Sequence, residues 1–264
     1  MTALTVTFLG TGTSNGIPVI GCDCAVCHST DPRDRRTRSS ITVHVGDRVI
    51  LIDTAPELRL QALAVGLRRV DAVLFTHAHA DHVAGFDDLR QFNYLAQSHL
   101  PVYAAPDTAR ELRQRFGYAF EDQFPFYGGK PDLILHEITG PFELFGQEII
   151  PIPVPHGRWT VLGFRFGPFA YITDAATVPE SALAALQGVQ VLVLNALRAR
   201  RHPTHLSIDE ALAVVERLKP QQAYFTHMSH EVSHAAVSAI LPPNVALAYD
   251  GLTITVGEAR RAAE

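Results

Sequence analysis

The segment 77–82, with the sequence HAHADH, constrains this chain more than any other feature. It holds three imidazoles and one carboxylate, and histidine is the commonest metal ligand in proteins. The apolar run at 73–75 comes just before it and predicts a buried strand that ends at Thr76. We therefore expect a loop at the edge of a sheet, where open α/β proteins usually place their chemistry, to present four metal ligands.

Composition and charge narrow the range of partners. Hydrophobic residues make up 47% of the 264 residues and charged residues 19%, as in an ordinary globular chain with a substantial core. The formal net charge is −5, and the basic runs at 33–38 and 198–201 are short. No strongly basic face is predicted, so we expect no duplex nucleic acid as a partner, whereas a small anionic substrate is compatible with this charge.

The N-terminus has neither the basic region nor the long apolar region of a signal peptide, and no apolar run approaches the ~20 residues that span a bilayer. We therefore predict no membrane partner and a cytoplasmic location. The cysteines lie at positions 22, 24 and 27. An odd number so close together makes a poor disulfide framework, which leaves a metal site or free thiols in a reducing compartment.

Short apolar or β-branched runs predict strands at 4–9, 40–45, 49–52, 72–75, 102–104, 133–137, 148–153, 163–166, 170–173, 191–194, 222–225, 245–247 and 252–256. Helices are predicted at 56–65, 86–97, 107–115, 208–218 and 232–240. Ser207 and Glu210 form a capping-box pattern at the start of the 208–218 helix. Because strands occur in pairs and runs, we predict two mixed sheets with helices outside them.

One domain is predicted over residues 1–258, with a cysteine-rich insertion near 21–28 and a flexible tail at 259–264, because no linker divides the chain. The segment 116–131 has the composition of a long loop or a lid. Glycines at 10, 12 and 16 follow the first strand, but their spacing and the absence of an apolar helix after them do not fit a dinucleotide-binding loop. We expect a turn whose backbone closely approaches a site.

Three lone polar residues follow other apolar runs. His156, Asp174 and His227 each come directly after such a run, so each can project from the end of a strand. If the segment 77–82 were only a histidine-rich surface turn, we would expect no further candidate metal ligands at strand ends elsewhere in the chain. The recurrence of histidine and aspartate at strand ends therefore indicates a shared metal centre.

The His-x-His-x-Asp-His pattern, with these later lone residues, resembles the metallo-β-lactamase superfamily over residues 9–251. The resemblance implies an α/β (α+β) fold, an αββα sandwich of two mixed β-sheets flanked by helices, with two divalent metal ions between the sheets. It also implies a set of ligands for each ion. One ion would be held by His77, His79 and His156, the second by Asp81, His82 and His227, and both would be bridged by Asp174.

The same resemblance implies roles for two aspartates beyond simple ligation. Asp81 is expected in the catalytic set as well as at the second ion. Asp53 matches an early strand-end aspartate of the superfamily and is expected to orient the histidine loop, because a ligating imidazole needs its other nitrogen fixed. A helix cap before Pro56 is the alternative for Asp53, and both roles can hold together.

The cysteine cluster predicts a second site of a different kind. Thiolates favour a closed tetrahedral zinc site, which needs a fourth ligand, and His28 is too close to Cys27 to serve. The insertion of Cys22, Cys24 and Cys27 after the first strand resembles the PhnP-like phosphodiesterases of the superfamily. That resemblance implies a structural zinc completed by His230, with free thiols as the alternative.

PhnP-like enzymes also place a histidine where it contacts phosphate and assists the leaving group. His205 stands in a similar position and is the expected general acid, since imidazole titrates near neutral pH; a loop histidine beside a helix start is the alternative. The ligand types fit zinc, manganese or iron equally. Cysteine is absent beyond position 27, which argues against the lactam-cleaving members.

The resemblance implies a dinuclear-metal-dependent phosphodiesterase that hydrolyses a small, preferably cyclic, phosphodiester such as phosphoribosyl 1,2-cyclic phosphate by attack of metal-activated hydroxide. It also makes a homodimer plausible. Two alternatives stay open. An RNA-processing hydrolase of the tRNA 3′-end type is disfavoured by the acidic charge and by the absence of a long RNA-binding arm. A non-catalytic, metal-stabilised binding protein is disfavoured by the complete set of ligands.

Overall fold

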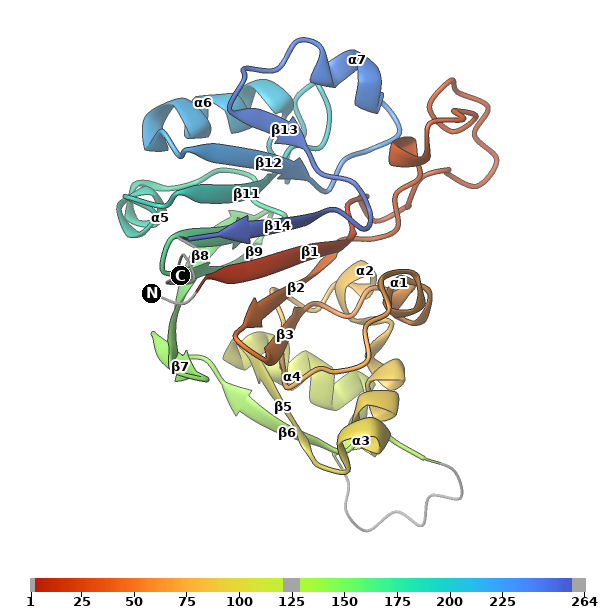
Figure 1. Cartoon of the computed structure of the whole chain (residues 1–264), viewed down its shortest axis with the longest axis vertical. Coiled ribbons are helices and arrows are strands. Elements are labelled where there is room, and N and C mark those ends of the chain that lie inside the picture. Colours follow the sequence, from red (N-terminus) through yellow and green to blue (C-terminus); the bar gives the residue numbers. More distant parts are fainter. Residues whose placement is uncertain (1–2, 121–128, 258–264) are drawn as a thin grey trace, which may run out of the picture.

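The computed structural model describes residues 3–120 and 129–257. Two seven-stranded sheets pack face to face, and helices cover the outer face of each sheet, which gives four layers (Figure 1). The fold class predicted from the sequence, an αββα sandwich of two mixed sheets, is confirmed. The predicted tail at 259–264 and the part of the predicted lid at 121–128 lie outside the described residues.

The first sheet combines antiparallel strands at one side with parallel strands at the other, in the order β14-β1-β2-β3-β4-β5-β6. Its strands are β1 (Leu4–Gly10), β2 (Ser40–Val45), β3 (Arg48–Ile52), β4 (Ala72–Leu74), β5 (Leu100–Ala104), β6 (Leu133–Glu137) and β14 (Thr253–Val256).

The second sheet has the order β13-β12-β11-β10-β9-β8-β7, with parallel pairing from β10 to β13. Its strands are β7 (Phe142–Leu144), β8 (Gln147–His156), β9 (Trp159–Phe166), β10 (Phe169–Ile172), β11 (Val191–Asn195), β12 (Gln222–Thr226) and β13 (Val245–Leu247). The parallel strands of both sheets bring several carboxyl ends to a common edge, which is where lone polar residues can meet.

The α-helices are α1 (Leu58–Val65), α2 (Ala80–Val83), α3 (Arg90–Ala96), α4 (Pro106–Arg115), α5 (Glu180–Ala185), α6 (Ile208–Leu218) and α7 (His234–Ser238). Short 3-10 helices lie at η1 (Pro32–Asp34), η2 (Phe86–Leu89) and η3 (Gly117–Ala119). Helix α6 begins with the predicted capping box, in which Ser207 and Glu210 satisfy each other's backbone N–H groups. Among the described residues, no helix is long and apolar enough to cross a bilayer.

Three apolar cores hold the layers together. The central core lies between the sheets and includes Phe8 and Phe164, both fully buried. A second core joins the outer face of the second sheet to α5 and α6, and a third joins the first sheet to η2, α3 and α4. Burial of such large side chains is the main favourable term for folding. The cores fix both sheets as rigid supports for the residues at their edge.

The sequence prediction was wrong about several short elements. Strand β7 and helices α2 and α5 were not predicted, and the helix predicted at 86–97 is divided into η2 and α3. Strand β7 has only three residues and pairs only with the first residues of β8. Its strand conformation therefore depends on this pairing and not on a pattern in its own sequence. Helix α2 is a single turn inside the histidine-rich segment, where no hydrophobic period can reveal it.

Strand β8 extends beyond the predicted end at residue 153 and carries His156 to its last position. Prolines at 151, 153 and 155 alternate with Ile152 and Val154 along this strand. Donors alternate sides along a strand, so these prolines all lack N–H groups on one side. Beyond residue 149, β8 pairs with β9 but not with β7, so the missing N–H groups cost no ladder hydrogen bond and the prolines can stay in the strand. On that side the Pro155 carbonyl accepts from the Ala176 N–H at 2.8 Å.

Gly85 lets the histidine-rich segment pack closely on the turn after β3. Its N–H donates to the Thr54 carbonyl at 2.9 Å, and a Cβ there would lie 2.2 Å from the Ala55 oxygen. We expect Gly85→Ala to lower the free energy of unfolding by ~1–3 kcal/mol, since the backbone must shift. Gly140→Ala, where a Cβ meets nothing within 4 Å, should change it by under ~0.5 kcal/mol. Equal denaturation midpoints for the two variants would contradict this packing argument.

Candidate dinuclear metal centre

Three residues that follow strands adopt left-handed backbone conformations. Asp53 follows β3, Asp174 lies just beyond β10 and His227 follows β12, with φ values of 63°, 61° and 55°. Residues other than glycine rarely adopt positive φ, although aspartate, asparagine and histidine do so more readily. Surrounding structure must hold such strain, which clusters at functional sites. Each chain therefore turns sharply at the sheet edge and leaves its polar side chain there.

The structure brings the predicted active-site ligands together in two groups. Within each group the candidate ligand atoms all lie within 4.8 Å of one another. The first group comprises His77, His79, His156 and Asp174, and the second comprises Asp81, His82, Asp174 and His227. Asp174 belongs to both groups, which is the placement that a carboxylate bridging two cations requires.

The buried carboxylate of Asp174 is surrounded by imidazoles. Its oxygens lie 3.1 Å from His227 Nε2, 3.4 Å from His82 Nε2 and 3.7 Å from His77 Nε2. Its Oδ2 also lies 3.8 Å from His156 Nε2. Burial opposes ionisation of Asp174, but the charges of the facing histidines hold its pKa well below the usual range. The carboxylate is therefore ionised and ready to bind cations.

Buried nitrogen atoms without hydrogen-bond partners test whether this set fits metal ions. Nε2 of His77, Nε2 of His82 and both ring nitrogens of His227 are buried and make no hydrogen bond, although the three Nε2 atoms lie 3.1–3.7 Å from Asp174 oxygens. Buried polar atoms nearly always have partners, so each exception requires an explanation. A divalent cation in each group would supply a partner for the three Nε2 atoms, and imidazole with carboxylate is a donor set that zinc, manganese and iron accept. The residues present fit the metals.

The pKa directions differ between the two groups. Burial lowers the pKa of His77 well below its ordinary value, which keeps the imidazole in the neutral form that binds metals. Burial also disfavours charge on His82, but Asp174, Asp81 and Asp53 together raise its pKa well above its ordinary value. The same three carboxylates that raise the pKa of His82 would also attract a cation to this group.

Hydrogen bonds to residues outside the two ligand groups fix the orientation of the histidine rings. Asp53 is fully buried, and its Oδ2 accepts a hydrogen bond from His82 Nδ1 at 2.7 Å. It also accepts from the Thr76 N–H at 2.8 Å, so one carboxylate ties the histidine loop to β3. His156 Nδ1 donates to the Thr204 carbonyl at 2.9 Å. Such contacts set the tautomer and leave Nε2 facing the centre. Asp53 does not cap α1, whose first flanking residue is Glu57.

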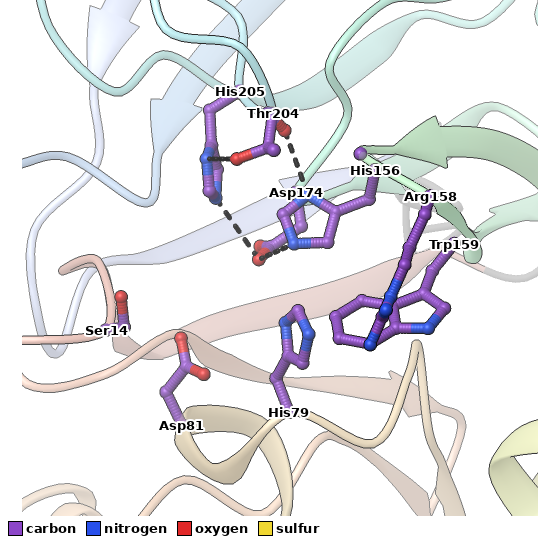
Figure 2. A pocket seen from close by; sticks show the side chains of 10 residues that line it. Ser14, His79, Asp81, His156, Arg158, Trp159, Asp174, Thr204 and His205 are labelled. Carbon is purple, nitrogen blue, oxygen red and sulfur yellow. Dashed lines mark hydrogen bonds and ion pairs between the residues drawn. The ribbon is translucent and has the colours of Figure 1, made fainter.

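A cavity of about 360 Å³ opens beside the two groups, and Figure 2 shows His79, Asp81, His156 and Asp174 pointing into it. His205 also lines it, with Nε2 at 3.4 Å from Asp174 Oδ2. The other ring nitrogen of His205 lies 2.9 Å from the Thr204 hydroxyl and 3.2 Å from Nδ1 of His202. Burial lowers the pKa of His205 to about 4. An anion in the cavity would favour its charged form.

The cysteines and His230 form a separate group of potential ligands. The sulfur atoms of Cys22, Cys24 and Cys27 lie 3.1, 3.5 and 3.8 Å from His230 Nδ1. A tetrahedral zinc with bonds of ~2.3 Å to sulfur and ~2.0 Å to nitrogen needs separations of about 3.5 Å. The Cys27 backbone N–H lowers the pKa of Cys24 to about 6, which favours the thiolate that binds metals. Burial raises the pKa of Cys27 to about 11.

A buried arginine, which the sequence analysis did not identify, supports the segment between the two sites. Arg36 is 1% exposed, and its guanidinium pairs with Asp34 at 3.0 Å and donates to the Val232 carbonyl at 2.8 Å. Met228 exchanges backbone hydrogen bonds with residues 11 and 13, each at 3.0 Å. The segment that carries His227 and His230 is therefore held on both sides. A buried arginine in a basic run gives no periodic signal in the sequence.

The glycine-rich turn at 10–16 approaches a neighbouring segment instead of the reacting centre. A Cβ on Gly10 would lie 2.0 Å from the Arg38 carbonyl, and one on Gly12 would lie 2.8 Å from the Arg36 carbonyl. The predicted close approach is therefore made to the chain at 36–38. Only Ser14 of this turn lines the cavity. Ser14 and Thr204 are cavity residues to which the sequence assigned no role.

Together, the αββα sandwich and this histidine- and aspartate-rich cavity define the class of protein, a metal-dependent hydrolase. A family model described as a β-lactamase superfamily domain matches residues 48–228, so the chain belongs to that superfamily. The resemblance inferred from the sequence is confirmed, as is the prediction of an enzyme.

Individual relatives refine this placement. A solved structure described as a new diphosphatase from the PhnP family is 42% identical, with a TM-score of 0.88, and the match covers 95% of this chain and 97% of that one. Zn²⁺-bound PqqB from Methylobacterium extorquens shares the fold at 22% identity and a TM-score of 0.77, over 95% and 99% of the two chains. An octanoyltransferase of Porphyromonas gingivalis is 38% identical over 95% of this chain, which spans 51% of its length.

The contact between Asp53 and His82 gives a testable role to a residue that binds no metal itself. We expect Asp53→Asn to weaken binding at the second group by ~10–100-fold, because the amide cannot accept both hydrogen bonds on the Oδ2 side. A chelator-competition titration measures the affinity. Asp250→Asn is the control, since Asp250 is also a carboxylate that accepts from Thr11 and Thr37 but contacts none of the site histidines. Unchanged metal affinity in Asp53→Asn would contradict the orienting role.

The cysteine group predicts one zinc ion with a structural effect. Cys24→Ser should remove one equivalent of zinc per chain, measured by elemental analysis, and lower the thermal midpoint, because a bound ion stabilises only the folded form. His28→Ala should keep the zinc, since the His28 side chain is exposed and lies 3.5 Å from Asp23. Full zinc content in Cys24→Ser would identify the cysteines as free thiols.

Proposed function

We propose that this chain is a dinuclear-metal phosphodiesterase that hydrolyses a small phosphodiester, preferably a cyclic one such as phosphoribosyl 1,2-cyclic phosphate. The observation that carries the proposal is the position of Asp174, whose carboxylate belongs to both ligand groups and borders the open cavity. The ligands leave that cavity free on one side, which is typical of catalytic metal sites and unlike closed structural ones.

Two divalent ions held in this way would supply Lewis acidity toward phosphoryl oxygens and would lower the pKa of water toward neutrality. The protein residues set the conditions for that chemistry. Asp174 and Asp81 supply negative charge that retains cations, and burial lowers the polarity around them. The hydrogen bonds behind His82 and His156 keep their rings aimed at the centre before any substrate arrives.

His205 is the proposed general acid. Its Nε2 faces the cavity beside Asp174 and can hold a proton toward an oxygen that leaves phosphorus. Thr204 and His202 contact its other nitrogen and fix the plane of the ring. His205 is absent from both ligand groups, which separates its role from metal retention.

A second candidate reaction is hydrolysis of a diphosphate bond, since the relative at 42% identity is named a diphosphatase. Both reactions displace an oxygen from phosphorus and need the same charge stabilisation. The RNA-processing alternative gains no support from a net charge of −5. The binding-protein alternative predicts metal retention without turnover.

We expect the metal-loaded protein to hydrolyse bis-p-nitrophenyl phosphate, chelation to abolish the reaction, and added Mn²⁺ or Zn²⁺ to restore it. His205→Ala should lower kcat ~10²–10⁴-fold with metal content unchanged, because a general acid contributes about this factor. His136→Ala, an exposed histidine that stacks on Tyr103, serves as the control. Loss of metal from His205→Ala would make it a ligand, and turnover that survives chelation would overturn the proposal.

A substrate panel separates the candidate activities. It compares phosphoribosyl 1,2-cyclic phosphate, a diphosphate diester and a tRNA precursor at equal enzyme concentration. The proposal expects the highest kcat/KM for the cyclic diester. A clear preference for the diphosphate would favour the second candidate reaction, and cleavage of the tRNA precursor alone would favour RNA processing.

A further inference from the structure

A second cavity, of about 330 Å³, adjoins the metal centre. It shares His79, Arg158 and Trp159 with the first cavity, so the two cavities adjoin at these side chains. Its remaining wall is built largely by residues of helix α4 and includes the side chains of Asp107, Arg110, Glu111 and Arg115. The two cavities together can hold a substrate larger than the reacting phosphate.

The charges in this second cavity are balanced except at one residue. Arg110 pairs with Asp107 at 2.6 Å, and Arg115 pairs with Glu111 at 2.9 Å. Arg158 lines both cavities, and within the described part of the chain its guanidinium forms no ion pair with a carboxylate, only the contact with Trp159. One positive charge is thus left uncompensated beside the metal ligands.

Trp159 holds this guanidinium in place. The Arg158 guanidinium carbon lies 4.8 Å from the centroid of the Trp159 ring, which is cation–π distance. The indole ring also meets His79 edge-on, with centroids 4.4 Å apart. Figure 2 shows the two side chains together at one side of the cavity, near His79 and His156. Trp159 is nevertheless 47% exposed, an unusual position for a side chain that merely fills a core.

The backbone connects this pair to the metal centre. His156 and Trp159 pair across the end of the β8–β9 hairpin, with Gly157 and Arg158 as the two residues of the turn. Gly157 has φ of 59°, as a turn with glycine at its first central position requires. The hairpin turn therefore places the Arg158–Trp159 pair directly beside the candidate ligand His156.

We propose that Arg158, supported by Trp159, binds a second anionic group of the substrate, a phosphate or a carboxylate that is separate from the reacting phosphorus. The inference rests on the proposed function, because in that proposal the metal ions held by the two ligand groups bind the reacting phosphate. A guanidinium recognises both kinds of anion through paired hydrogen bonds, and stacking on an aromatic ring keeps it oriented for them. Arg158 is thus a specificity-determining residue that acts at a distance from the bond that breaks.

The test compares two substrates that differ only in the second anion: ribose 1,2-cyclic phosphate with and without a 5-phosphate. The wild-type ratio of kcat/KM should favour the phosphorylated substrate, and Arg158→Gln should lower that ratio by about tenfold, mainly through KM, as the loss of a charge-assisted contact predicts. Arg113→Gln removes a guanidinium of α4 that pairs with Glu137 away from both cavities, and should keep the wild-type ratio.

Fluorescence gives a readout that does not depend on turnover, because Trp159 is the only tryptophan in the chain. Ribose 5-phosphate should change the emission of the wild-type protein, and half-saturation should need about tenfold more of it in Arg158→Gln. Ribose without phosphate should cause no comparable change. Replacement of Arg158 by lysine should restore part of the preference, since the charge is kept and the paired geometry is lost.

The outcomes separate this inference from the proposed function. An unchanged substrate ratio and an unchanged ribose 5-phosphate titration in Arg158→Gln would overturn the subsite while leaving chelator-sensitive hydrolysis intact. Absence of hydrolysis of bis-p-nitrophenyl phosphate by the metal-loaded wild-type protein would instead overturn the proposed function. A carboxylate preference would appear if ribonic acid shifted the emission at lower concentration than ribose 5-phosphate.

Discussion

The carboxylate of Asp174 sets the conditions for the whole site. It is 1% exposed and lies 3.1–3.8 Å from nitrogens of five histidines. A buried carboxylate is costly unless positive charge or hydrogen bonds compensate it. The imidazoles that surround it come from both sheets, so the two sheets must pack in one relative position for that compensation to exist. Cation binding at Asp174 is in this sense a property of the complete sandwich.

Strand ends deliver these residues because of backbone geometry. Asp53, Asp174 and His227 all adopt positive φ directly after or just beyond a strand. The strain is balanced by the cores on both faces of each sheet and by buried contacts such as those of Asp53 with Thr76 and His82. The rigid scaffold thus holds conformations that an isolated loop would abandon, and the site is organised before it binds anything.

Much of this arrangement could be predicted from the sequence. The HAHADH segment and the lone residues 156, 174 and 227 mark strand ends by their position after apolar runs, and a family resemblance assigns them to two groups that the structure also forms. Elements whose existence depends on a partner could not be predicted: β7 pairs only with the first residues of β8, and α2 is one turn long. The role of Arg36 was missed because an arginine in the basic run at 33–38 carries no sign of what surrounds it.

The prolines of β8 also bear on how the molecule behaves beside copies of itself. A strand at the margin of a sheet offers unpaired N–H groups on which another chain can add. Residues 150–156 lie at such a margin, yet the prolines at 151, 153 and 155 leave it without donors there. A neighbouring chain could form hydrogen bonds there only by donating to carbonyls of β8, which makes intermolecular β-pairing on the strand that carries His156 unfavourable.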